Sequence, residues 1–359
     1  MIYKVVLVSL IAIFGTGCGS LVGPTNLRNE RQDFNIALQQ TNDEQMLLNL
    51  VRMKYRDTNM FLEVNSVASQ YSLTSNITAS GSLTNNFSNS IGLGSKIEYS
   101  EKPTISYTPL HGQSFITRLL SQTSPETIGL LYKSGWSVER LFLLCMERIG
   151  DVKNAPSASG PTPSYVPEFK DFKRLCDLLR DMQVDGSIKL DVVQIPDSKQ
   201  IGFALYIMKE ADKTKASEIR KILGLGEADY YLFSQHNSAD KSIMFETRSI
   251  REILFYLSHG VQVPDEHVAR GLVTKTKKED GSMFDWEEMT GDLLKVKSCK
   301  CPAPPGNAYV SVRYRGNWYF IEDSDLNSKS TFALLIQLYD LQSGDVKGSA
   351  PVLTIPIGG

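Results

Sequence analysis

The chain has 359 residues, 42% of them hydrophobic and 22% charged, which is a globular composition rather than a disordered one. Its formal net charge of −2 gives no broad electrostatic reason to bind nucleic acid. The length is comfortable for two domains. After the N-terminal segment, no stretch approaches the roughly 18 apolar residues of a membrane-spanning helix.

The N-terminal segment has the three-part order of an export signal. One positive charge, Lys4, precedes an almost wholly apolar run at 5–14, and small residues at 15–17 come directly before Cys18. This order resembles the lipobox of bacterial lipoproteins. The resemblance implies that residues 1–17 are a signal peptide and that Cys18 is lipidated and acylated. The alternative is an ordinary secretory signal with an incidental cysteine.

The residues after Cys18 resemble a sorting signal. Gly19 and Ser20 lack the aspartate that commonly retains a lipoprotein at the inner membrane. We therefore expect an outer-membrane lipoprotein that faces the periplasm and is held in the membrane by the lipid on Cys18. Stable anchoring takes two signals, which several acyl chains supply.

Residues 18–30 are polar and predict a tether to the folded part. Arg31–Gln40 has a helical pattern. Thr41 and Glu44 form a capping-box motif before apolar residues at helical spacing. The sequence therefore predicts two short helices that end near Asp57.

The region from about 67 to 107 predicts one long β-hairpin. No charged residue occurs from Val64 to Ser95, and the apolar residues from Val67 onward fall on odd numbers. This period of two is typical of a strand with one apolar and one polar face. Asn85 and Asn86 suit a tight turn. We expect 67–84 to pair with 87–107.

This hairpin has two interpretations. Its apolar face packs on helices at 114–149 in a soluble sheet, or it serves assembly by pairing with other protomers or entering the bilayer. One hairpin cannot close a barrel, so the second interpretation requires several protomers. The curli secretion channel is similar in this architecture alone. An oligomeric outer-membrane β-barrel export pore is thus the alternative function.

After Pro109 the pattern becomes helical over 114–122, 125–133 and 137–149. Residues 155–167 are rich in proline, serine and alanine and predict a linker. We therefore expect a helical domain with the hairpin at 31–154 and a second domain at 168–359.

The second half alternates helices and strands. We expect helices at 168–183, 215–223, 250–259 and 326–341, and strands at 187–195, 200–208, 230–234, 242–247, 309–314, 318–322 and 351–357. The predicted fold class is α+β: N-terminal helices with one long β-hairpin, then a mixed α/β C-terminal domain.

No catalytic, cofactor-binding or metal-binding motif is recognisable. Of four histidines, His259 is expected at a helix end and His267 on the surface. Ser137, Ser249 and Ser328 are expected as helix caps. We therefore expect no enzyme activity, cofactor or metal; a periplasmic hydrolase, with its residues brought together only by the fold, is the second alternative.

The other cysteines leave their pairing open. Cys145 and Cys176 lie in apolar helical patterns and are expected to be buried. Cys299 and Cys301 form Cys-Lys-Cys, which an oxidising compartment can oxidise, but spacing cannot say which pairs form.

Two segments, Gln45–Arg52 and Pro103–Leu110, resemble those of an uncharacterised group of proteobacterial-type lipoproteins. The resemblance implies no activity. The expected function is a non-catalytic scaffold or envelope-assembly component, whose partners are the membrane and either other copies of the chain or envelope proteins, with no nucleic acid.

Overall fold

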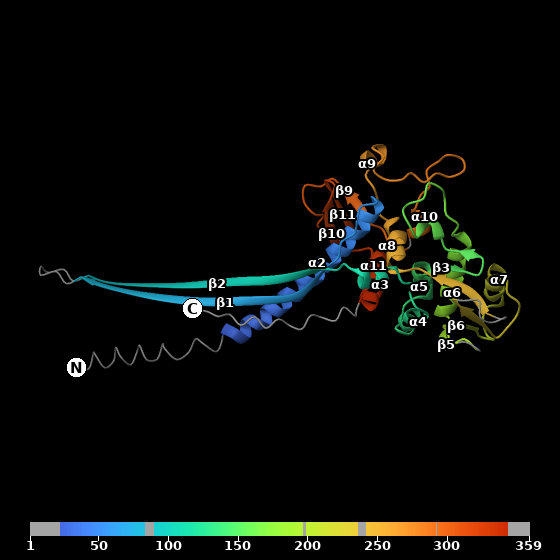
Figure 1. Ribbon diagram of the computed structural model, residues 1–359, viewed down its shortest axis with the longest axis horizontal. Coiled ribbons are helices and arrows are strands. Elements are labelled where there is room, and N and C mark those ends of the chain that lie inside the picture. The colour runs from blue at the N-terminus through green and yellow to red at the C-terminus, as the bar shows by residue number, and fades with distance from the viewer. Residues whose placement is uncertain (1–21, 83–89, 197–198, 236–241, 292, 344–359) are drawn as a thin grey trace. The chain divides into compact units, whose positions relative to one another are not determined.

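The computed structural model describes residues 22–82, 90–196, 199–235, 242–291 and 293–343, with 22–30 and 65–103 described by backbone alone (Figure 1). These residues form two compact units. Unit 1 comprises the described residues up to 59 and those of 118–342, and unit 2 comprises those of 60–117. The predicted α+β fold class is confirmed.

Unit 1 contains most of the helices, and α3 joins the two units in sequence. The helices are α2 (Val22–Lys54), α3 (Gln113–Leu120), α4 (Pro125–Lys133), α5 (Val138–Cys145), α6 (Lys170–Val184), α7 (Lys213–Leu223), α8 (Ile250–Ser258), α9 (Asp265–Ala269), α10 (Glu287–Thr290) and α11 (Leu326–Ser343), with a 3₁₀ turn, η1 (Pro156–Ala158).

Unit 1 also holds two sheets. The first has the order β4-β3-β8-β7-β6-β5, and only its β7–β8 pair is parallel; the second has the order β10-β11-β9. The strands are β3 (Met146–Ile149), β4 (Val152–Lys153), β5 (Ile188–Gln194), β6 (Ile201–Ile207), β7 (Tyr230–Ser234), β8 (Ser242–Thr247), β9 (Lys297–Cys299), β10 (Ala308–Tyr314) and β11 (Asn317–Glu322).

The six-stranded sheet carries a main apolar core. Helices α5 and α6 contact its strands, and α7 packs on α6. Large side chains fill the space between them: Phe142, Leu175, Leu179, Phe203, Phe233 and Phe245. Burial of such side chains contributes about 1.5–3 kcal/mol each and holds the layers together.

Helix α2 is one continuous helix, so the predicted break at Thr41 is wrong. The Thr41 hydroxyl donates to the Leu38 carbonyl at 3.0 Å, which satisfies it inside the helix instead of at an N-cap. The helix also begins at Val22, within the segment predicted as a tether. Its C-terminal half is buried, and α2 packs on β10 and α8.

The end of α2 is a Schellman turn. The Asp57 amide donates to the Arg52 carbonyl and the Arg56 amide to the Met53 carbonyl. Arg56 takes the left-handed conformation that this motif requires, with φ 61°. The turn therefore fixes the directions in which residues 54–57 leave the helix.

Helix α5 ends at Cys145, whereas the sequence predicts a helix through Ile149; residues 146–149 form β3 instead. At this point the buried guanidinium of Arg248 donates to the carbonyls of Leu143 and Met146, at 2.9 Å each. The Asn154 side chain donates to the same two carbonyls, at 2.9 and 2.7 Å. Side chains from outside α5 thus satisfy carbonyls that a helix end leaves without partners.

Residues 155–167, predicted as a linker, lie within unit 1 and are tied to it. Ser159 accepts a hydrogen bond from Arg248 at 2.8 Å, and the Thr162 carbonyl accepts one from Arg56 at 3.0 Å. Ala155, Ala158, Ser159 and Thr162 are buried. Small side chains allow this close approach, so a composition typical of linkers here belongs to a packed segment. The compact units accordingly do not divide there.

Unit 2 contains the predicted hairpin, formed by β1 (Leu62–Ser82) and β2 (Ser90–Pro109). The strands are antiparallel, and beyond an irregularity near Val64 the register pairs odd-numbered residues with odd-numbered ones, as in Leu73 with Tyr99 and Ala79 with Leu93. The register therefore combines the apolar alternation of both strands on one face. The predicted turn at Asn85–Asn86 and the predicted strand at 351–357 lie outside the described residues.

Candidate functional site

A pocket of about 520 Å³ in unit 1 is the principal cavity that we consider. It lies where the end of α2, the end of α8 and the segment leading into β9 meet. Lys54, His259 and Trp286 line it, and so do the apolar side chains of Val261, Phe284, Leu294 and Val296. We call it the Lys54 pocket. Its volume falls in the range of about 300–1,000 Å³ that small-molecule sites occupy.

Lys54 places a positive charge in this pocket. Its side chain is 6% exposed, and among the described residues it has no hydrogen-bond or ion-pair partner. The Trp286 ring lies 5.6 Å from its Nζ, within the range of a cation–π contact. Burial lowers the pKa of Lys54 to about 8, so the amine stays mostly protonated at neutral pH.

His259 is the C-cap residue of α8, as the sequence predicts, and it is neutral. Burial, with the charge of Lys54 next in importance, lowers its pKa well below the usual value. Its Nε2 lies 3.1 Å from the Ala158 carbonyl and therefore donates, and its Nδ1 lies 3.5 Å from the Thr162 hydroxyl. The ring stacks on Trp286 at 4.0 Å. His259 is thus fixed in place and does not supply a free base.

The expectation that His267 lies on the surface is wrong. The ring is 2% exposed, and its Nδ1 lies 2.7 Å from the Tyr55 hydroxyl. Tyr55 also contacts the Tyr319 hydroxyl at 2.6 Å. These contacts tie α2, α9 and β11 together. Because two tyrosines and a histidine satisfy one another there, the cluster has a structural role.

Asp57, the last residue of the turn after α2, is hydrogen-bonded to the β10–β11 hairpin. Asp57 accepts hydrogen bonds from the Tyr314 hydroxyl and, at 2.8 Å, from the Arg315 guanidinium. Hydrogen bonds from Tyr314 and Arg315 outweigh desolvation and lower the pKa of Asp57. Four consecutive residues, 54–57, therefore each contact a segment of unit 1 that is distant in sequence.

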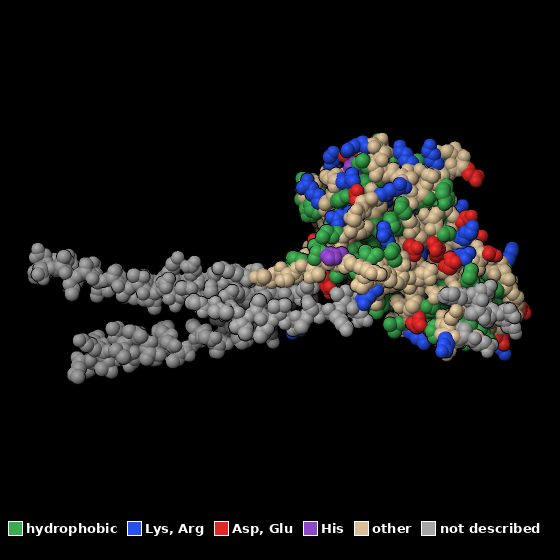
Figure 2. Space-filling view, viewed as in Figure 1, with side chains coloured by type: hydrophobic (Ala, Val, Ile, Leu, Met, Phe, Trp, Pro, Cys, Tyr) green, Lys and Arg blue, Asp and Glu red, His purple; other side chains and the backbone are tan. Residues whose placement is uncertain are grey.

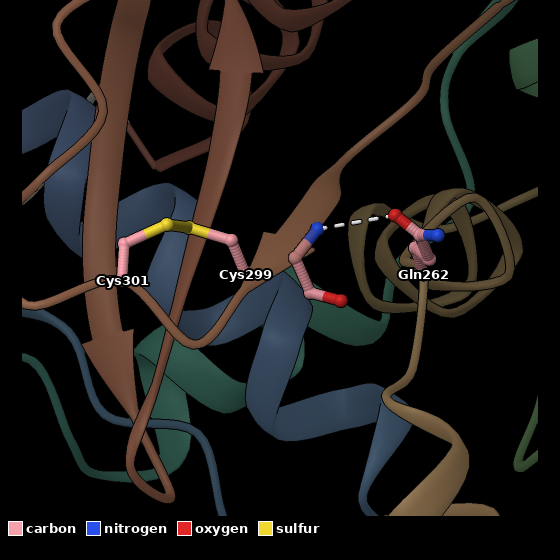
Figure 3. Close-up of a disulfide and its surroundings, with 4 residues drawn as sticks. Gln262, Cys299 and Cys301 are labelled. Atoms are coloured by element: carbon pink, nitrogen blue, oxygen red, sulfur yellow. Dashed lines mark hydrogen bonds between the residues drawn. A yellow bond between two sulfur atoms is a disulfide. The ribbon is translucent and has the colours of Figure 1, made fainter.

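The cysteines divide into a disulfide and two buried thiols. Cys299 and Cys301 form a disulfide at the end of β9, and Figure 3 shows it beside Gln262, whose side chain accepts the Ser298 amide at 3.2 Å. Cys145 and Cys176 are free and buried, as predicted. Burial raises the pKa of Cys145 to about 12 and that of Cys176 as well, so neither is a reactive thiolate.

The predicted caps are partly confirmed. Ser137 caps α5, and Ser249 forms a capping box with Glu252 at α8. At α11 the Ser328 amide donates to Asp325, which lies just before the helix. Cys18 lies outside the described residues.

Within the described residues, no group of three or more histidines, cysteines or carboxylates is placed to hold a metal. None of the described helices has the length and apolarity needed to cross a membrane. On the face of unit 1 that Figure 2 shows, basic and acidic side chains are interspersed, in keeping with a net charge of −2. No protein-family model, curated protein or solved structure matches the chain.

The sequence analysis overlooked Lys54, although the pattern contains a signal for it. Leu47, Leu50, Val51 and Lys54 follow the i, i+3, i+4, i+7 spacing of one helix face. A lysine on the apolar face of a helix predicts either a long side chain that reaches water or a buried charge with a purpose. The partners that make Lys54 part of a pocket come from distant segments, which spacing does not reveal.

Proposed function

We propose that the chain is a lipid-anchored outer-membrane lipoprotein that faces the periplasm and acts without catalysis as an assembly component. In this proposal the hairpin of unit 2 joins one copy of the chain to the next. The lipid anchor is Cys18, and its support is the sequence order that resembles a lipobox. The role of the hairpin is supported by its geometry.

The hairpin is a two-stranded sheet of unusual length, and this observation carries the proposal. Its strands have 21 and 20 residues, which at about 3.4 Å per residue extend about 70 Å. Over 66–82 and 90–106, neither strand pairs with a third strand among the described residues. An isolated hairpin is marginally stable in water, and long open edges recruit other strands.

The base of the hairpin adds a second line of support. Ile105 and Tyr107 belong to the odd-numbered, apolar series of β2, and they are 42% and 54% exposed. Within the described residues, the apolar face is therefore largely open at these positions. An apolar face in water is costly, and a second protein surface or a membrane removes that cost.

A second copy of the chain fits these edges. Over 66–82 and 90–106, the outer edge of β2 in one copy and the outer edge of β1 in the next have no third strand among the described residues. The same contact can therefore repeat head to tail, and it closes into a ring if the rotation allows. The finer alternative is that such a ring is an oligomeric barrel in the outer membrane. The run without charge from Val64 to Ser95 favours it.

The test is the mass of the full chain in mild detergent, measured by light scattering during gel filtration. A shortened variant replaces residues 67–105 with Asn-Gly. Ser66 and Ser106 are paired, so a two-residue turn closes the remaining ladder. We expect a discrete oligomer for the wild type and a monomer for the shortened variant. A wild-type monomer, or the same number of copies in both proteins, contradicts the proposal.

The anchor is tested separately, by labelling cells with an alkyne fatty acid. We expect label on the wild type and none on Cys18→Ala. Cys299→Ala is the control for loss of a cysteine as such, and it should label normally. Equal labelling of wild type and Cys18→Ala rejects the lipid anchor but leaves the mass result unaffected.

A further inference from the structure

Among the described residues, the charge of Lys54 in its pocket has no counter-charge. A buried ammonium is costly unless an anion pairs with it. The C-terminal end of α2 offsets part of this cost, because the helix dipole favours a cation there. Among the described residues, however, no carboxylate pairs with Lys54.

The neighbouring groups do not balance Lys54. His259 is neutral and its ring nitrogens face Ala158 and Thr162. The lining carboxylates, Asp265, Asp285 and Glu287, are exposed at the rim. Glu287 pairs with Lys295 at 3.4 Å, and Asp285 accepts the Glu287 amide at 2.9 Å. Among the described residues, the buried part of the pocket is therefore left with the one positive charge of Lys54.

The walls next to this charge are apolar. Val261, Phe284 and Val296 are at most 5% exposed, although each lines the pocket. The remaining lysines of the lining are more exposed than Lys54, and both are paired: Lys297 with Glu322 at 2.6 Å, and Lys295 with Glu287. A single buried cation under apolar walls matches a ligand with one negative charge and an apolar body. It does not match a phosphate, which takes several donors.

We propose that the Lys54 pocket binds a small organic monocarboxylate, with the carboxylate on Lys54 Nζ and the apolar body against Val261, Phe284 and Val296. The site is independent of the hairpin and of the lipid anchor. Carboxylate binding pairs the buried ammonium, and the apolar body removes wall surface from water.

Isothermal titration of the full chain tests this proposal with octanoate and three comparison probes. Octanoate has the charge and the apolar body; octanol lacks the charge, octylamine reverses it, and inorganic phosphate lacks the apolar body. We expect octanoate to bind at least tenfold more tightly than the other three. No octanoate binding at millimolar concentration, or equal binding of octanol or phosphate, overturns the proposal.

Two variants locate the binding in the pocket. Lys54→Met keeps the length of the side chain and removes its charge, and Val263→Trp fills space at the pocket wall. Each should weaken octanoate binding at least tenfold. Lys170→Met, at the exposed start of α6, is the matched control and should bind as the wild type does. Unchanged binding by Lys54→Met overturns the proposal, and circular dichroism verifies that each variant is folded.

Discussion

At the scale of single residues, the centre of unit 1 is organised by two buried cations with different surroundings. Arg248 has a hydrogen-bond partner for each of its nitrogens, mostly backbone carbonyls, and its guanidinium also lies 4.1 Å from the centre of the Tyr256 ring. Lys54 lines a pocket, and among the described residues its charge contacts an indole ring but no hydrogen-bond partner. Removal of a hydrogen-bonded buried charge costs the fold the hydrogen bonds that it makes, whereas removal of an unpaired one relieves the cost of its desolvation. The two residues should therefore respond in opposite directions to removal of the charge.

Lys54→Met should raise the free energy of unfolding. Because burial lowers the pKa of Lys54 from 10.5 to about 8, keeping the amine charged in the fold costs up to about 3 kcal/mol at pH 7. Between pH 8 and 10.5 the unfolded state binds more protons at this site, so wild-type stability rises with pH. The advantage of the variant should therefore shrink over that interval and vanish above it. Urea unfolding at pH 7, 9 and 10.5 measures this difference, and a gap independent of pH would count against a buried charged amine.

Arg248→Met should destabilise the protein by about 3–5 kcal/mol, because it removes the buried hydrogen bonds that the guanidinium donates to the carbonyls of Leu143, Met146 and Asn154. Arg251→Met, at an exposed position of α8 three residues after Arg248, is the control and should change stability by less than about 0.5 kcal/mol. Urea unfolding compares the two. Similar stabilities for both variants would mean that Arg248 does not hold the end of α5.

The thiols give a third expectation at this scale. Without reductant, the native Cys18→Ala variant should take up no maleimide, because Cys145 and Cys176 are buried and Cys299 is bonded to Cys301. In denaturant, Cys145 and Cys176 should each take up one label, and peptide mass mapping identifies them. Labelling of Cys299 or Cys301 under those conditions would exclude the disulfide.

At the scale of elements, the sequence predicted what local pattern controls and missed what distant residues control. The alternation of the hairpin and the boundaries of α4, β7 and β8 are local properties, and they agree with the structure. Arg248 donates to carbonyls at the end of α5, and α2 packs on β10 and α8. Both contacts involve residues far away in sequence. Of the pocket, only the position of His259 at a helix end was predictable. Its remaining walls come from segments that meet only in the fold.

The hairpin register makes the alternation testable. Leu93→Arg and Ile77→Arg place a charge in the odd-numbered series and should abolish the oligomer, whether that face contacts another copy or lipid. Thr74→Arg is the control, since Thr74 belongs to the polar series and pairs with Glu98. Gel filtration in mild detergent gives the masses, with circular dichroism as the check on folding. Loss of the oligomer in Thr74→Arg as well would show that the two faces are not distinguished.

At the scale of the whole molecule, the chain leaves unit 1 after residue 59 to form the hairpin and re-enters it at 118. Unit 1 is thus discontinuous in sequence. It contains the Lys54 pocket, the six-stranded sheet and the three-stranded sheet. Composition suggested a boundary at 155–167, since it records proline and small residues but not what they contact. A unit that has its own hydrophobic core should fold without the other unit.

Unit 1 should therefore tolerate loss of the hairpin. In the variant with 67–105 replaced by Asn-Gly, the main unfolding transition should stay within about 3 °C of the wild type, as calorimetry measures, because the core of α5, α6 and the six-stranded sheet is intact. Lys54→Met should stabilise the full-length protein and the shortened protein equally. A much lower transition in the shortened protein would show that the units do not fold independently.

The turn at the end of α2 has a mechanical consequence. The helix is about 50 Å long at 1.5 Å per residue, and contacts of residues 54–57 with Trp286, Tyr319, Thr162 and Arg315 fix its far end. A pull applied at the start of this helix is carried along its hydrogen-bonded axis to that turn. Of these four residues Lys54 lines the pocket, so tension on the start of α2 and a ligand at Lys54 would both act on this turn.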